Sequence, residues 1–166
     1  AMAGHCDLVM ITLDAEGLIT VTDNGRGIPI DIHPATGKTA LETVMTTLHA
    51  GGKFGGGAYK VTGGLHGVGG SVVNGLSEHL KAEVRRDGWT YSQEYAEGLP
   101  LGDVEKGDKT QDHGTTIAFQ PDPKIFPDIE YDFDTLVSHF KEIAFLNKGL
   151  EIQFVSPWHL QQRDGD

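Results

Sequence analysis

The chain has 166 residues, of which 38% are hydrophobic and 22% charged, a size and composition that suit one compact domain and exclude a disordered chain. Its 24 Asp and Glu against 13 Lys and Arg give a formal charge of −11, which argues against a direct grip on DNA, because phosphate binding needs a basic face. The sequence contains neither an apolar run long enough to span a membrane nor a secretory signal pattern, so we expect a cytoplasmic protein.

The first predicted elements are two β-strands over residues 7–25, joined by a turn at Ala15–Gly17. Apolar and polar residues alternate on both sides of this turn, with Val9 and Ile11 before it and Val21 after it. This pattern predicts a hairpin in the interior of a sheet.

An amphipathic helix is predicted to begin at Thr39, where the spacing of apolar residues changes to that of a helix. Thr39 and Glu42 fit a capping box at its start, and the glycines after Ala50 should end it. A second helix is expected to begin near Gly67 and to run through Leu76.

Two further strands are predicted on either side of a turn at Asp87–Gly88, followed by a strand over residues 114–121 that ends at a proline. Apolar residues at helical spacing over 133–144 predict a closing helix, with Gly149 suited to its C-terminal cap. A last strand is predicted over residues 150–155.

The final segment, residues 156–166, loses its periodicity and is expected to be a loosely held tail. The sum of the predicted elements is an α+β fold. We expect a two-layer sandwich, in which a mostly antiparallel sheet carries helices on one face.

Ten of the chain's 23 glycines lie between Gly51 and Gly70. A glycine-rich loop before a helix can wrap phosphates, because glycine reaches positive φ and the N–H groups at a helix N-terminus attract anions. Lys53 and Lys60 add positive charge to this segment. Glycine richness alone is equally typical of a flexible surface loop, so both interpretations stay open.

Asp23 follows an apolar strand and precedes Gly25 and Gly27 in the stretch TVTDNGRGIP. Its carboxylate would lie where the backbone turns sharply and a flat ligand can approach. There it could accept a hydrogen bond from the exocyclic amine of adenine, where guanine has a carbonyl edge. The alternative is an Asx turn, in which the aspartate bonds only its own loop.

Four stretches, DNGRGIP, LHAGGKFGGGAYK, GGLHGVGGSVVN and FLNKG, together resemble the ATPase domains of bacterial type II topoisomerases, of the DNA gyrase B type. These domains belong to the GHKL superfamily, with Hsp90, MutL and the histidine kinases, and share its Asp-x-Gly-x-Gly turn and glycine lid. The resemblance implies the Bergerat (GHKL) ATPase fold over residues 1–155 as a partial domain lacking its first helix. Residues 156–166 would be a tail or the start of a further connection.

By this resemblance Asp23 would bind the N6 amine of adenine, partly through a water, and Gly27 would let the base approach closely. Thr115 would join the same hydrogen-bond network. Three apolar residues would sandwich the base, although they are also ordinary core residues: Val21, Ile28 and Ile117.

The resemblance further implies that the lid, residues 51–68, closes over the triphosphate, with Lys53 and Tyr59 near the nucleotide. The lid backbone that would hold the phosphates, with His66 as a ligand contact rather than an acid or base, comprises Leu65, His66, Gly67, Val68 and Gly69. Arg26, Pro29 and Arg86 would form the rim where aminocoumarin inhibitors overlap the ATP site. For Arg86 the alternative is a solvated arginine at a strand end.

Two functional residues of such ATPases are expected upstream of residue 1, on a helix before the first strand. They are a glutamate that activates water and an asparagine that holds Mg²⁺. ATP and Mg²⁺ are the implied cofactors, yet no catalytic and no metal-binding residue is expected in the chain itself. The chain alone should bind without turnover, because loss of a positioned general base costs about 10²–10⁴-fold in rate.

The implied parent protein is a homodimer through its ATPase domains. Its implied partners are the A subunit of gyrase and DNA, and this acidic domain itself is not expected to bind DNA directly. The B subunit of topoisomerase IV is the alternative parent, and a nucleotide-binding sensor without chemistry is the alternative role. The long glycine lid and FLNKG argue against a histidine kinase.

Overall fold

The computed structural model describes residues 6–46, 73–125 and 132–163, with side chains up to residue 160. The strands within these ranges are β1 Leu8–Leu13, β2 Ile19–Asp23, β3 Ser77–Arg86, β4 Trp89–Ala96, β5 Leu99–Pro100, β6 Glu105–Lys109, β7 Gly114–Pro121 and β8 Glu151–Val155. The helices are α1 Ala40–Thr46, α3 Phe133–Leu146 and α4 Pro157–Arg163.

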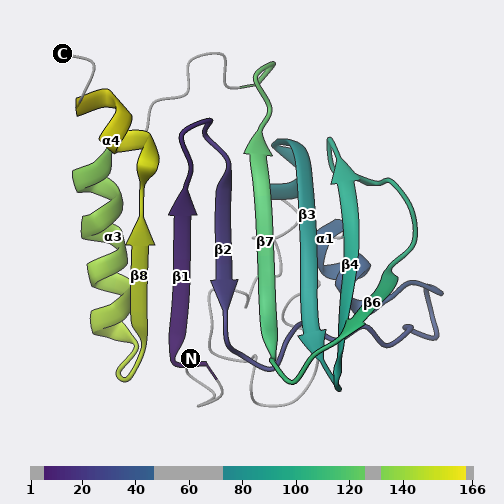
Figure 1. The fold of residues 1–166 in the computed structure, drawn as a ribbon. Coiled ribbons are helices and arrows are strands. Elements are labelled where there is room, and N and C mark those ends of the chain that lie inside the picture. The colour runs from purple at the N-terminus through teal and green to yellow at the C-terminus, as the bar shows by residue number, and fades with distance from the viewer. Residues whose placement is uncertain (1–5, 47–72, 126–131, 164–166) are drawn as a thin grey trace.

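The eight described strands form one sheet with the order β5-β4-β3-β7-β2-β1-β8, and β6 also pairs with β4 (Figure 1). Every pairing is antiparallel except that of β1 with β8, which is parallel. The mostly antiparallel sheet of the predicted α+β fold is therefore confirmed. Both strands of the predicted first hairpin have a neighbour on each side, so the hairpin lies inside the sheet.

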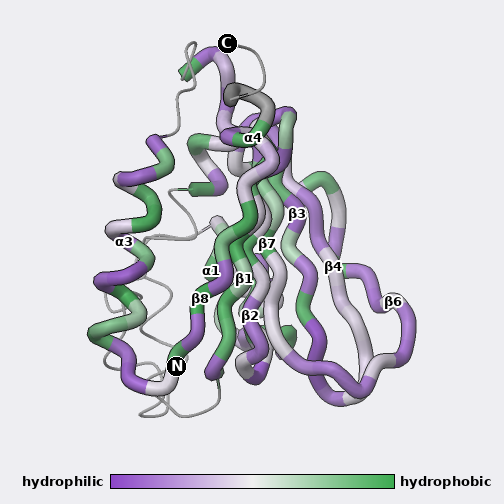
Figure 2. Tube along the Cα trace, turned by 60° about the vertical axis from the view of Figure 1, so that its left-hand side comes forward, coloured by the Kyte–Doolittle hydropathy of each residue, from purple (hydrophilic) through white to green (hydrophobic). Residues whose placement is uncertain are grey.

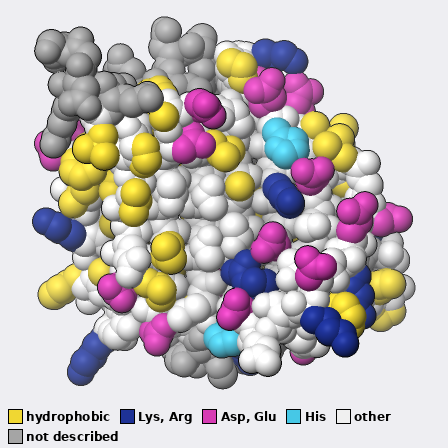
Figure 3. All heavy atoms as spheres, in the orientation of Figure 1, with side chains coloured by type: hydrophobic (Ala, Val, Ile, Leu, Met, Phe, Trp, Pro, Cys, Tyr) yellow, Lys and Arg dark blue, Asp and Glu magenta, His cyan; other side chains and the backbone are white. Residues whose placement is uncertain are grey.

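Strand alternation gives the sheet two chemically different faces. One row across the inner face is mostly apolar: Phe154, Ile11, Val21, Ile117, Ala82 and Gln93. The neighbouring row, on what we call the open face, is mostly polar: Val155, Thr12, Thr20, Ala118, Lys81 and Glu94. Figure 3 shows the open face, where charged side chains gather over β3, β4 and β6 and apolar ones over β1 and β8.

Helices α1 and α3 cover the inner face, as predicted. Leu41 and Met45 of α1 pack in a buried cluster with Leu80, Ala82, Val84 and Tyr95. At the other end of the sheet, Phe133 and Phe140 of α3 contact the ring of Phe154 in β8, with centroids 5.7 and 5.1 Å apart. Figure 2, turned by 60°, shows α1 and α3 on the same side of the sheet.

The start of α1 confirms half of the predicted capping box. The Glu42 amide donates to Thr39 Oγ1 over 3.1 Å, which satisfies one free N–H at the helix N-terminus. The Glu42 carboxylate does not reach back to Thr39; its Oε1 accepts instead from Gln93 Nε2 at 2.8 Å. The predicted end of this helix after Ala50 lies outside the described residues.

The predicted hairpin turn at Asp87–Gly88 is confirmed, with φ values of 55° and 85° that match a type I′ turn. The second predicted helix falls mostly outside the described residues. Its expected extension through Leu76 is wrong, because the helical backbone ends at Gly75, Leu76 lies in a turn and β3 begins at Ser77.

The closing helix and last strand are confirmed as α3 and β8, with two corrections at the C-terminal end. Asn147 caps α3, its backbone N–H donating to Ile143 O, while Gly149 lies two residues further on with φ 87°. Residues 157–163 form α4 rather than a loose end. The Ser156 hydroxyl accepts a hydrogen bond from the His159 amide, and Pro157 suits the first helical position. Local capping therefore explains the helix.

Candidate functional site

Asp23, the last residue of β2, is held by one of its two carboxylate oxygens. Oδ1 accepts hydrogen bonds from the amides of Gly25 at 2.9 Å and Thr115 at 3.2 Å. Oδ2 accepts no hydrogen bond from any residue that the structure describes. The bond from Gly25 shows that the Asx turn of the alternative interpretation is present, and it still leaves an oxygen for a ligand.

Thr115 joins Asp23 to the turn that follows it. The threonine is buried, its amide bonds Asp23, and its Oγ1 accepts from the amide of Ile28 at 3.0 Å. The structure therefore joins Asp23 and Thr115, although they are 92 positions apart in the chain. Their shared role in binding adenine stays a prediction.

Gly27 has a conformation and surroundings that only glycine fits. Its φ is 82°, and a Cβ there would lie 2.9 Å from Arg85 O and 3.0 Å from Val84 Cγ1. A side chain at this position would therefore require the end of β3 to move. The structure confirms the need for glycine; base approach at this point stays a prediction.

Arg86 is attached to this turn rather than free at its strand end. Its Nη1 donates to Gly27 O at 2.9 Å, and its Nε donates to Asp87 Oδ2 at 3.2 Å. Of the other two predicted rim residues, Arg26 lies in the same turn and is exposed, and Pro29 lies two residues after the turn and is half-buried. The three residues predicted to form the rim thus lie on or beside the Asp23–Gly27 turn, and their contact with an inhibitor stays a prediction.

The three apolar residues expected around the base lie on or beside the inner face. Val21 pairs with Ile117 between β2 and β7, and Ile28 and Ile117 pack against the buried cluster of α1, β3 and β4. The role of Ile28 and Ile117 in the core is therefore shown. Contact with a base stays a prediction.

The expected phosphate contacts lie outside the described residues: Lys53, Tyr59, Leu65, His66, Gly67, Val68 and Gly69. Within the part of the chain that the structure describes, no three His, Cys, Asp or Glu side chains are grouped so that they could hold a metal ion. No described helix is both long and apolar enough to cross a membrane.

Four residues that support the turn were missed by sequence reasoning. Asn24 Oδ1 accepts from the amides of Asp7 and Leu8, both at 3.0 Å, and so ties the turn to the start of β1. Gly114 has φ 137°, and a Cβ there would lie 2.0 Å from Asp23 O. The glycine before Thr115 was the available signal for this close approach.

The other two missed residues, Arg85 and His113, also contact the turn. Arg85 Nη2 donates to Asp23 O at 3.5 Å, and His113 Nδ1 lies 2.7 Å from Gly25 O. No sequence pattern marks either contact, because both depend on how β3 and β7 are placed beside the turn.

Comparison with known proteins shows to which family this chain is similar. Residues 1–125 match the family described as "Histidine kinase-, DNA gyrase B-, and HSP90-like ATPase". The chain is 54% identical over 154 residues to the B subunit of DNA gyrase from Thermotoga maritima, covering 93% of this chain and 24% of that protein. It is 55% identical over 159 residues to that of Synechocystis, covering 93% of this chain and 14% of that protein.

A third relative is the DNA gyrase B subunit of Streptomyces niveus, whose name includes the word "novobiocin-sensitive". It is 52% identical over 153 residues, which cover 92% of this chain and 22% of that protein. The chain thus spans about a quarter or less of the length of these three relatives. The family match covers most of the chain and includes the Asp23 turn and Thr115, so the chain belongs to the histidine kinase-, DNA gyrase B- and HSP90-like ATPases.

Proposed function

We propose that this chain is the ATP-binding part of the ATPase domain of a DNA gyrase B subunit. The observation that carries the proposal is Asp23, whose Oδ1 is occupied by two backbone amides while Oδ2 accepts nothing from the described residues. Membership of the ATPase family and the names of the relatives support it. The names of the relatives favour gyrase over topoisomerase IV as the parent.

The proposed chemistry of recognition follows from the donors and acceptors. An ionised carboxylate only accepts hydrogen bonds, so Oδ2 suits the exocyclic amine of adenine, directly or through a water, and repels the carbonyl of guanine at the same position. Thr115 holds the carboxylate and Ile28 together, and the lack of a side chain at Gly27 lets the turn pack directly against the end of β3. The close approach of the base at Gly27 is proposed from the family resemblance. ATP would supply the phosphoanhydride bond; these residues would select and orient its base.

The triphosphate part of the site is proposed to lie in the glycine-rich segment. Lys53 and Tyr59 would contact the nucleotide, and the backbone of residues 65–69 would hold the phosphates. Mg²⁺ is proposed as a cofactor of the parent protein, because this ion is usually bound through substrate phosphates and few protein ligands. Arg26, Pro29 and Arg86 are proposed to bind aminocoumarins, a proposal supported by the word "novobiocin-sensitive" in the name of one relative.

The parent protein is proposed to use ATP to change DNA topology by double-strand passage. Its proposed partners are the A subunit of gyrase, DNA and a second copy of its own ATPase domain, in the cytoplasm. The ATPase domain is proposed to extend over residues 1–155. The formal charge of −11 supports the view that DNA is gripped elsewhere in the parent.

The test is calorimetric titration of the chain with non-hydrolysable ATP and GTP analogues, with Mg²⁺ present. We expect the ATP analogue to bind and the GTP analogue to bind far more weakly. Asp23→Asn should weaken the ATP analogue about tenfold or more, because it replaces a hydrogen bond to a charged acceptor. Asp31→Asn, which removes the same charge from an exposed residue nearby, should not.

Equal binding of the two analogues, or an Asp23→Asn variant that binds ATP like the original chain, would refute adenine recognition by Asp23. Lack of binding by a chain shown by circular dichroism to be folded would refute nucleotide binding by this polypeptide.

A further inference from the structure

The turn Asp23–Gly27 has an unusual arrangement of side-chain donors along its backbone. Every second carbonyl of the turn lies against a nitrogen of a basic side chain: Asp23 O at 3.5 Å from Arg85 Nη2, Gly25 O at 2.7 Å from His113 Nδ1, and Gly27 O at 2.9 Å from Arg86 Nη1. We call this arrangement the carbonyl clamp. Its donors come from the end of β3 and from the residue just before β7.

We propose that Arg85 and His113 are positioning residues for adenine binding, which they support by fixing the backbone that orients the Asp23 carboxylate. This inference rests on the function proposed for Asp23. Neither residue is itself required to touch the nucleotide. Arg86, the third donor of the clamp, is already proposed as part of the rim.

The role of His113 as a donor follows from its partner. The carbonyl of Gly25 can only accept, so a ring nitrogen 2.7 Å away must carry the proton, in either the neutral Nδ1–H form or the imidazolium. The residue after His113 packs against the same turn, because an added Cβ at Gly114 would lie 2.0 Å from Asp23 O. His113 therefore links the turn to the start of β7.

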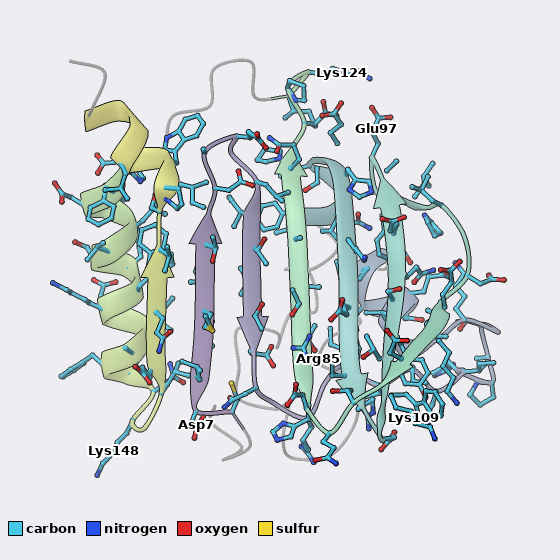
Figure 4. The ribbon with its side chains drawn as sticks, in the orientation of Figure 1. Asp7, Arg85, Glu97, Lys109, Lys124 and Lys148 are labelled. Carbon is cyan, nitrogen blue, oxygen red and sulfur yellow. The ribbon has the colours of Figure 1, made fainter. Side chains whose placement is uncertain are left out.

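Arg85 reaches the turn from the other side of the sheet. Its side chain lies on the open face, where Nη1 donates to Thr116 Oγ1 at 2.9 Å and to Glu83 Oε1 at 3.1 Å, and it is only 15% exposed. Figure 4 labels it on this face at the lower end of β3 and β7. Arg85 and Arg86 alternate in direction along β3, so consecutive residues hold the turn from opposite faces.

The clamp determines where the donors to Asp23 lie. Oδ1 is oriented by the amides of Gly25 and Thr115, and the carbonyl of Gly25 is the one that His113 holds. If the turn shifts, the amide of Gly25 moves and the carboxylate loses its fixed direction. The loss should therefore reduce the preference for a purine with an amine, more than it reduces binding of purine nucleotides in general.

The first experiment measures this preference in the full chain. Dissociation constants are determined for non-hydrolysable analogues of ATP and of inosine triphosphate, which has a carbonyl in place of the amine. The variants are Arg85→Met, which keeps the stem and removes the donors, and His113→Ala. We expect each to lower the preference for the ATP analogue about three- to tenfold, the range for one hydrogen bond.

Two kinds of control accompany these variants. His113→Asn keeps a nitrogen donor near the position of Nδ1 and should restore most of the preference. Lys124→Met removes one positive charge and the 2.9 Å ion pair with Glu97 at the opposite end of the sheet, and should leave the preference unchanged (Figure 4). An equal loss of affinity for both analogues in Arg85→Met and His113→Ala, or no loss for either, would overturn the proposal.

A second experiment needs no nucleotide and so separates this proposal from that for ATP binding. Hydrogen exchange of the Gly25, Ile28 and Thr115 amides, each bonded to a side chain of the site, is followed by NMR. Arg85→Met with His113→Ala should speed this exchange about tenfold or more, the effect of two lost hydrogen bonds, while amides in the centre of β3 and β4 keep their rates.

Unchanged exchange at these three amides would overturn the clamp even if the chain binds ATP. If the double variant exchanges faster and the original chain binds no ATP analogue, the carbonyl clamp holds the turn but the proposed function is refuted.

Discussion

The two ends of the sheet are packed very differently, although both carry helices on the inner face. Around β3, β4 and α1, Leu80 and Tyr95 are 0% exposed and belong to one continuous cluster. Around β8, no residue of α3 is buried, and Phe145 is 88% exposed. The same architecture thus produces a close-packed end and a thinly covered end within one domain.

The candidate site is supported mainly by the close-packed end. Val84 of the buried cluster lies against Gly27, and Arg85 and Arg86 continue the same strand into the turn. β2 and β7, which carry Asp23 and Thr115, lie between the two ends. The difference teaches that close packing is concentrated on the side of the sheet from which the turn is held.

The largest expected effect is a truncation in the close-packed end. Leu80→Ala should lower the free energy of unfolding by about 2–5 kcal/mol, through lost apolar burial and the cavity left behind. Phe145→Ala, at the thinly covered end, should change it by less than about 0.5 kcal/mol. Urea unfolding followed by circular dichroism measures both, and similar losses in the two variants would show that the ends do not differ.

The next effect concerns the site itself. Gly114→Ala should cost about 2 kcal/mol more than Gly37→Ala, because the added Cβ would lie 2.0 Å from Asp23 O and must displace it, and forcing extra atoms into a packed site costs about 1–3 kcal/mol. Gly37 is the matched control, since it also has positive φ but has no atom within 4 Å of an added Cβ. Urea midpoints compare the two; a Gly114→Ala variant as stable as Gly37→Ala would mean that the turn can move away freely.

Much of this fold is predictable from local sequence patterns. Alternating residues on both sides of Asp14–Leu18 indicate β1 and β2, and Asp87–Gly88 indicates the β3–β4 hairpin. The direction of β8 is not predictable in this way, because alternation is the same in parallel and antiparallel strands. The helix α4 is not predicted, although Ser156 and Pro157 are typical helix-start residues, because this segment lacks the apolar spacing of an amphipathic helix.

Less of the candidate site than of the fold is predictable from local sequence patterns. Asp23 and Gly27 are marked by the turn motif. Thr115 is indicated only by the family resemblance, because it lies 92 positions from Asp23 in the chain and strand pairing brings the two together. Arg85 and His113 have no local signal, because an arginine in a strand and a histidine in a loop are ordinary surface residues until the pairing of β3 with β7 places them. Contacts between distant segments are what sequence patterns leave undetermined.

A smaller effect, with a dependence on pH, is expected from the polar group buried in the close-packed end. Tyr95 Oη donates to Gln93 Oε1 at 2.6 Å, and Gln93 in turn donates to Glu42 of α1. Burial, with the negative charge of Glu42, raises the pKa of Tyr95 well above its ordinary value. Tyr95→Phe should cost about 1 kcal/mol at pH 7, the contribution of one hydrogen bond.

The sign of the pH effect follows from the raised pKa. Below about pH 10 the tyrosine is neutral in both the folded and the unfolded chain, so the stability difference between the original chain and the Tyr95→Phe variant is constant. Above about pH 10 only the unfolded chain ionises, so the original chain loses stability that Tyr95→Phe does not lose. Urea unfolding at about pH 7 and about pH 10.5 should show the difference shrinking; a constant or growing difference would contradict the raised pKa.

The smallest expected effects come from one chemical change made at each end, the loss of a helix N-cap hydroxyl. Thr39→Ala removes the acceptor of the Glu42 amide in α1, whose residues are part of the buried cluster, and should lower global stability by about 1 kcal/mol. Ser156→Ala removes the acceptor of the His159 amide in α4. Because α4 lies beside the thinly covered end, we expect it to fray locally, with faster amide exchange over residues 159–162 and a global loss of less than about 0.5 kcal/mol. Equal global losses would mean that α4 unfolds together with the core, and that the thin cover at β8 still belongs to the same cooperative unit.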